Sequence, residues 1–169
     1  TPIPRTLAMT MYADLDVSVI QELPPGRQPV KTVALSDGRR GDVVSRVREA
    51  CAHGQRAYWV CPLIEESDAL EYQDAESTYE MLKQALPEQS VGIIHGRMRP
   101  AEKEQVMKAF ATGQHDVLVA TTVIEVGVDV PEATLMIVEN SERMGLAQLH
   151  QLRGRVGRSH HQAYAYLLS

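Results

Sequence analysis

The chain has 169 residues, of which 44% are hydrophobic and 23% charged, and its formal net charge is −5. It has no run of about 18 apolar residues and no signal-peptide pattern, which excludes a membrane-spanning helix and favours one cytoplasmic domain with a buried core. The acidic balance argues against a uniformly basic surface that coats nucleic acid. Cys51 and Cys61 have neither metal-ligand nor redox spacing, so we expect buried thiols.

The first feature along the chain is a junction near the N-terminus. Residues 23–29 contain three prolines and a glycine, which do not fit inside a central strand or a helix. We therefore expect residues 1–27 to be the end of a preceding domain with its junction. Residues 28–169 are then expected to form the main domain.

Beyond the junction, short apolar runs alternate with segments of helical period. This pattern predicts an α/β fold of three layers, with helices on both faces of a mostly parallel sheet. The expected strands are residues 31–35, 57–61, 91–95, 116–121, 134–139 and 163–168. The expected helices are residues 42–52, 75–86, 100–112 and 146–153.

The helix at 100–112 is marked at both ends. Pro100 suits the first helical position, Glu102 suits the positive end of the helix, and Gly113 suits its termination. Val106 and Phe110 share one face at four-residue spacing, so we expect them to pack on the sheet.

A turn with two arginines, residues 95–99, follows the expected strand at 91–95. The carboxyl ends of parallel strands are where ligands gather in open sheets, so Arg97 and Arg99 are placed to contact a phosphate backbone. A lone histidine after a strand is more often a packed residue than a ligand, so no metal role is expected for His95.

The apolar strand at 116–121 ends in two hydroxyl side chains, Thr121 and Thr122. Together with backbone N–H groups at the start of a short helix, these hydroxyls suit a nucleic-acid phosphate. For either threonine alone, a simple helix cap is an equally good interpretation. Gly127 permits close approach of a ligand, and the Asp129 carboxylate suits a ribose hydroxyl or an arginine.

The strongest motif is Gln-Leu-Arg-Gly-Arg-Val-Gly-Arg at residues 151–158. If this segment is a continuous helix, Gln151, Arg155 and Arg158 lie within about 60° of one another. Two guanidinium groups that face one way suit the oxygens of a phosphate. The alternative interpretation is a pair of surface arginines that are solvated or bound to nearby carboxylates.

The same motif has an apolar side, and its glycines suggest close packing. Leu149, Leu152 and Val156 lie opposite the polar side of the expected helix, so they are predicted to pack on the sheet. Gly154 and Gly157 each weaken a helix by about 1 kcal/mol, which suggests that backbone approaches closely there.

The chain lacks a Gly-x-x-x-x-Gly-Lys-Ser/Thr loop and an Asp-Glu pair after an apolar strand. It is therefore expected to complete a nucleotide-hydrolysis site but not to form one alone, and no metal ligand is expected within it. The isolated chain should be inactive.

Three segments resemble motifs of superfamily-2 helicases: TPIPRTL (1–7) resembles motif III, TTVIEVGVDVP (121–131) motif V, and QLRGRVGR (151–158) motif VI. DLDVSVIQELPPGRQPVKT, AYWVCPLIEES and HGRMRPAEKEQVM are similar to the RecG family of bacterial branch-migrating DNA helicases. The last stretch, SHHQAYAYLLS, is more similar to the transcription-repair coupling factors. The resemblance implies that residues 28–169 are the second RecA-like lobe of a helicase.

The resemblance also implies a site and its partners. ATP would lie between two lobes, with the phosphate loop and Mg²⁺ on the preceding lobe, and the DNA would be branched or forked. The implied ATP-site residues are Gly127, Asp129, Gly154, Arg155 and Arg158, and the catalytic ones are Gln151, Arg155 and Arg158, with Arg158 as the arginine finger. The implied DNA contacts are Arg97, Arg99, Thr121 and Thr122.

Three alternatives accompany this interpretation. A coupling factor would translocate on DNA without necessarily separating its strands. A non-enzymatic module would bind nucleic acid or a protein with the same fold. A dinucleotide-dependent enzyme would need a Gly-x-Gly-x-x-Gly turn after the first strand, and residues 36–41 do not supply one.

Overall fold

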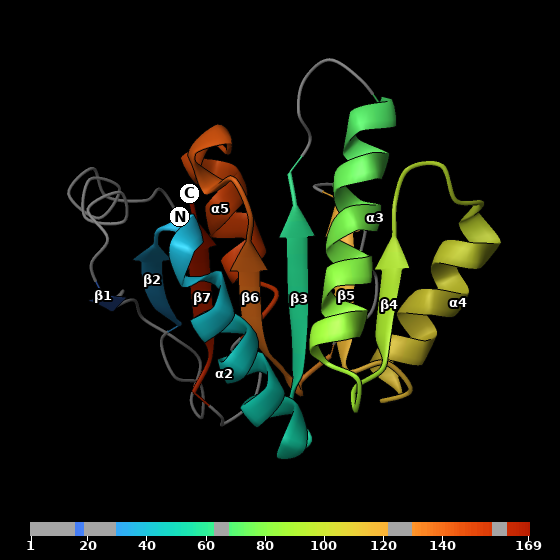
Figure 1. The fold of residues 1–169 in the computed structure, drawn as a ribbon, viewed down its shortest axis with the longest axis horizontal. Helices are drawn as coiled ribbons and strands as arrows, with labels where there is room; N and C mark the ends of the chain where they lie inside the picture. The colour runs from blue at the N-terminus through green and yellow to red at the C-terminus, as the bar shows by residue number, and fades with distance from the viewer. Residues whose placement is uncertain (1–15, 19–29, 63–67, 122–129, 157–161) are drawn as a thin grey trace.

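A seven-stranded sheet forms the centre of the computed structural model, which describes residues 16–18, 30–62, 68–121, 130–156 and 162–169 (Figure 1). The strands lie in the order β1-β2-β7-β6-β3-β5-β4. Six of them are parallel, and β1 pairs antiparallel with β2. Their bounds are β1 Asp16–Ser18, β2 Lys31–Leu35, β3 Arg56–Cys61, β4 Val91–Ile94, β5 Val117–Thr121, β6 Ala133–Val138 and β7 Tyr164–Leu168.

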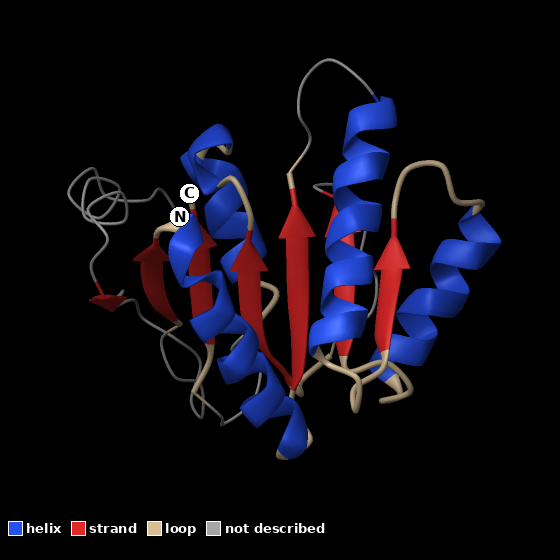
Figure 2. Cartoon of the chain, in the orientation of Figure 1, coloured by secondary structure: helices blue, strands red, loops and turns tan. Residues whose placement is uncertain are grey.

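Helices cover both faces of this sheet, which confirms the expected three-layer α/β class (Figure 2). The helices α2 and α3 pack on one face, and α4 and α5 pack on the other. The bounds are α2 Arg40–Ala52, α3 Asp68–Ala85, α4 Pro100–Ala111 and α5 Leu146–Arg153, with short 3-10 helices at Asp37–Arg39 (η1) and Ser141–Arg143 (η2). No helix of the described ranges is long and apolar enough to cross a membrane.

The sheet has a hydrophobic core on each face, and alternate residues of each central strand point into one core or the other. On β3, Tyr58 and Val60 belong to the cluster under α4 and α5, whereas Trp59 and Cys61 belong to the cluster under α2 and α3. Because successive side chains of a strand point to opposite faces, a strand covered on both sides needs apolar residues throughout. Residues 57–61 are all buried, which explains why their sequence is a continuous apolar run.

The expected strands and helices are confirmed, and most of their ends agree to within two residues. The exception is α3, which begins at Asp68 rather than at residue 75. Strand β1 and the helices η1 and η2 were not expected, since each has only three residues.

Helix α4 begins and ends as its sequence predicts. Pro100 is its first residue, and the Glu102 carboxylate accepts a hydrogen bond from the Arg99 backbone N–H at 3.3 Å. Phe110 is fully buried, with Val106 packed against the same core. Gly113 has a φ of +89°, a left-handed conformation that favours glycine after a helix.

Candidate functional site

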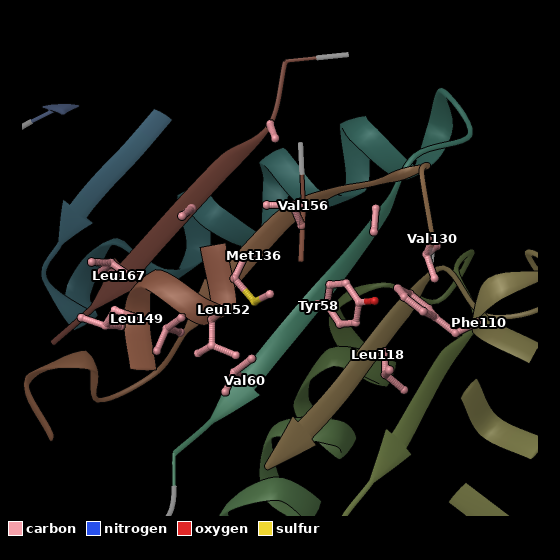
Figure 3. Packing of buried hydrophobic residues seen from close by; sticks show 14 of the residues in the cluster. Tyr58, Val60, Phe110, Leu118, Val130, Met136, Leu149, Leu152, Val156 and Leu167 are labelled. Carbon is pink, nitrogen blue, oxygen red and sulfur yellow. The ribbon is translucent and has the colours of Figure 1, made fainter. Parts of the chain in front are cut away.

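Helix α5 and the turn after it carry the described part of the Gln-Leu-Arg-Gly-Arg-Val motif. Leu149, Leu152 and Val156 are buried in the core beneath α4 and α5, as expected for the apolar side of this segment (Figure 3). Gln151 is exposed, and Arg155 is half-buried. The packing of these three apolar side chains therefore holds α5 and the following turn against the sheet, and the polar groups of the motif lie on this segment.

The helix expected at 146–153 is confirmed at both of its ends, so the condition of a continuous helix through the whole motif does not hold. Helix α5 ends at Arg153, and Gly154 forms its C-cap, with φ −67° and ψ −11°. Arg155 then lies in a turn, and its backbone N–H donates to the Leu152 carbonyl at 3.0 Å. Gly154, a residue type that weakens helices, stands where the last turn of α5 closes. Because the helix ends there, the relative directions of Gln151 and Arg155 do not follow from helical spacing.

The close approach at Gly154 is local. A Cβ on this residue would lie 3.3 Å from the Gln151 carbonyl oxygen and 3.7 Å from that of His150. Gly154 is also exposed, so its tight contact is with its own helical turn rather than with the sheet. Gly157 and Arg158 lie outside the described residues.

Arg153 lies between Gln151 and Arg155 in the motif and is buried. It was not singled out from the sequence. The residue is only 7% exposed, and its Nη2 donates to the Val30 carbonyl at 3.3 Å. Its Nε and Nη1 have no hydrogen-bond partner in the described structure. Burial lowers the pKa of this guanidinium from its ordinary value. The available signal was position, because residues 149, 152, 153 and 156 follow the spacing of one helix face.

The two arginines after β4 lie in an exposed turn, as expected. Within the turn, the His95 Nδ1 accepts a hydrogen bond from the Arg97 backbone N–H at 3.2 Å, and the Arg99 Nε lies 3.9 Å from the Glu102 carboxylate. Burial is the main cause of a lowered pKa at His95, which favours the neutral imidazole. The side chain of Arg99 is 88% exposed, so its guanidinium is accessible to an anion.

Thr121 is placed differently from the expected DNA contact. It is the last residue of β5 and is only 3% exposed, so its hydroxyl lies inside the domain in this conformation. The other candidates in this stretch, Thr122, Gly127 and Asp129, lie outside the described residues.

The expected DNA contacts and the end of α5 lie far apart in the topology. Arg97 and Arg99 follow β4, at the carboxyl edge of one outer strand. Arg153 at the end of α5 contacts Val30, which precedes β2 at the amino edge. Four strands separate β2 from β4 in the sheet. The turn after β4 and the end of α5 thus lie at opposite edges of the sheet.

A buried carboxylate at the carboxyl edge was also missed. Glu139 follows β6 and is 7% exposed, and its two oxygens accept hydrogen bonds from Arg40 Nη2 at 2.6 Å and Nε at 3.0 Å. The Trp59 Nε1 donates to the same carboxylate at 3.2 Å. These bonds to Glu139 are the main cause of a raised pKa at Arg40. Since a buried tryptophan N–H needs an acceptor, the lone Trp within an apolar strand was the signal for this network.

The two cysteines are free thiols, and Cys61 is buried as expected while Cys51 is half-buried. Burial raises the pKa of each thiol to about 12, so both are protonated at neutral pH. Protonated thiols are poor nucleophiles and metal ligands, which agrees with a packing role for both residues. In the described ranges no group of three or more His, Cys, Asp or Glu side chains is placed to hold a metal ion.

Comparison with known proteins identifies the domain. Residues 42–160 match the family described as the helicase conserved C-terminal domain. The chain is 67% identical over 169 residues to the ATP-dependent DNA helicase RecG of Escherichia coli (strain K12), a match that covers 99% of this chain and 24% of that protein. The chain thus spans about a quarter of the length of this relative.

Solved structures agree with this match. A structure of RecG bound to a three-way DNA junction has a TM-score of 0.73 and 48% identity, covering 99% of this chain and 22% of that one. Domain 2 of the DEAD-box helicase Mss116p, bound to an RNA duplex, has a TM-score of 0.62 at 16% identity over 81% of this chain and 53% of that one, which shows the fold alone. The expected RecA-like fold and the resemblance to RecG helicases are therefore confirmed, and the chain belongs to the helicase conserved C-terminal domain family.

Proposed function

We propose that the chain is the second motor lobe of an ATP-dependent DNA helicase that acts on branched DNA in recombination and replication-fork repair. The observation that carries this proposal is the 67% identity to a RecG helicase, which runs through the whole chain and includes the motif carried by α5. The relative with a solved complex is bound to a three-way DNA junction, which supports branched DNA as the partner.

The geometry of α5 suits a lobe that completes an ATP site. Leu149, Leu152 and Val156 fix the helix on the sheet, so Gln151 and the turn at Arg155 are held at defined positions. Bound ATP supplies the phosphoryl group that is transferred to water, with Mg²⁺ held by the preceding lobe. Arg155 and Arg158 donate hydrogen bonds to the phosphate oxygens, Arg158 acts as the arginine finger, and Gln151 senses the nucleotide. Gly127, Asp129 and Gly154 complete this chain's part of the site.

Arg97 and Arg99 form the DNA side of the lobe, together with Thr122. Guanidinium groups in an exposed turn at the carboxyl edge bind phosphates without recognising base sequence. Because this turn and α5 belong to one packed domain, closing of the cleft around ATP moves the DNA-binding turn as well.

The test uses a RecG chimera, in which these 169 residues replace the matching segment of the E. coli K12 helicase. We expect the RecG chimera to hydrolyse ATP when a three-way DNA junction is added, and the isolated chain to show no turnover. A correctly folded chimera without junction-stimulated hydrolysis would contradict the proposed function. Turnover by the isolated chain, free of contaminating ATPases, would contradict the division of the site between two lobes.

A further inference from the structure

Arg153 joins the end of α5 to the start of β2. Its Nη2 donates to the Val30 carbonyl at 3.3 Å, and the Val30 side chain packs against the cluster that contains Leu149, Leu152 and Val156. One residue further, the Lys31 backbone N–H donates to the Ala163 carbonyl at 3.0 Å. α5 thus contacts both the backbone carbonyl and the side chain of Val30 at the start of β2. The segment that leads into β7 holds the next residue, Lys31.

Stability alone does not explain a charged side chain in this place. Arg153 is 7% exposed, and its one hydrogen bond to another described residue, at 3.3 Å, is a weak compensation for loss of hydration. Apolar residues that replace poorly compensated buried charges often leave a protein equally or more stable. An arginine on the apolar face of α5 therefore points to a role other than packing.

Resting on the proposed function, we propose that Arg153 is a positioning residue that couples the nucleotide-binding end of α5 to the start of β2. Arg153 lies two residues before Arg155, so a shift of that turn when the arginines bind phosphate pulls on Arg153. The hydrogen bond to Val30 passes the shift to the point where the chain leaves the junction with the preceding lobe. Arg153 itself does not touch ATP or DNA.

The test measures how strongly nucleotide and DNA binding influence each other in the RecG chimera. DNA affinity is measured with and without a non-hydrolysable ATP analogue, and the ratio of the two affinities is the coupling factor. Arg153→Met keeps a long apolar side chain but removes every donor, whereas Arg153→Lys keeps the charge and a donor. Arg48→Met is the matched control, because Arg48 Nη2 also donates to a backbone carbonyl, that of Ala85 at 2.8 Å, between two helices.

We expect Arg153→Met to reduce the coupling factor by about tenfold, within the usual range of coupling between sites, while the melting temperature does not fall. Arg153→Lys should restore part of the coupling, and Arg48→Met should leave it unchanged. A folded Arg153→Met variant with unchanged coupling would overturn the proposal. An unsubstituted chimera that shows no coupling would instead contradict the proposed function.

If Arg153→Met does not fold, Arg153→Gln replaces it. The glutamine side chain stays polar but is too short to keep the Val30 bond, so coupling should fall as for Met. Intact coupling in folded Arg153→Gln would equally overturn the proposal.

Discussion

The indole nitrogen of Trp59 donates a hydrogen bond to Oε2 of Glu139 at 3.2 Å, inside the domain. This bond joins the central strand β3 to the end of β6, while Arg40 at the start of α2 binds the same carboxylate. Trp59→Phe keeps an aromatic ring but removes the donor. Because hydrogen bonds to charged groups contribute about 1.5–3 kcal/mol, we expect the free energy of unfolding to fall by about 2 kcal/mol.

Urea unfolding measures this loss, and a double-mutant cycle with Glu139→Leu, which removes the acceptor, separates the hydrogen bond from the change in ring size. A cycle with no interaction energy between the two positions would contradict a stabilising bond.

The protonated thiol of Cys61 should make stability fall at alkaline pH. Burial raises the pKa of Cys61 from 9.0 to about 12 in the folded chain, so the folded state keeps its proton while the unfolded state loses it. The contribution of Cys61 to stability is therefore constant below pH 9.0 and falls as the pH rises from 9.0 towards 12, by up to about 1.4 kcal/mol per pH unit. Urea unfolding from pH 8 to 11 should show a shallower decline for Cys61→Ala, and equal slopes would refute the assignment.

The arginine-finger role of Arg158 is tested by kinetics in the RecG chimera. Arg158→Ala should lower kcat by about a thousandfold or more, while DNA affinity stays nearly unchanged, because a finger stabilises charge that develops on the transferring phosphoryl group. Thermal melting serves as the control for folding. A variant that melts normally and hydrolyses ATP at the unsubstituted rate would show that Arg158 is not the finger.

The turn after β4 should show the opposite behaviour. Arg97→Ala or Arg99→Ala should weaken DNA binding and reduce its salt dependence by about one unit of slope for each lost phosphate contact. ATP turnover at saturating DNA should remain, because four strands separate this turn from the side where α5 ends. Affinity titrations at several salt concentrations measure the slope, and Arg39→Ala, in the exposed 3-10 helix η1 after β2, is a suitable comparison. A slope unchanged from the unsubstituted chimera would exclude a phosphate contact.

The main elements could be predicted because buried parallel strands leave a strong pattern. Residues 57–61 and 135–138 are continuous apolar runs, and both proved to lie in central strands covered on two faces. Helix α5 has the bounds expected for it, 146–153. The first turns of α3 were missed because acidic residues at a helix start also resemble a solvated charged surface.

The site was only partly predictable, since a motif names residue types but not the direction of their side chains. Arg153 resembled its neighbour Arg155 in sequence. Because α5 ends at Gly154, between them, Arg153 is buried whereas Arg155 is half-buried. Thr121 resembled an open hydroxyl at the end of a strand, yet β5 carries it inside the domain. Both outcomes depend on how neighbouring elements pack, which a single sequence does not record.

The antiparallel pairing of β1 with β2 bears on how this lobe behaves when it is cut from a longer protein. The register joins Asp16 to Val33 and Ser18 to Lys31, so β1 covers the outer hydrogen-bonding edge of β2. A fragment that starts at residue 30 would leave the edge of Lys31–Leu35 unpaired, and such edges recruit strands from other copies. A shortened fragment is therefore prone to self-association and aggregation even where its own core is intact.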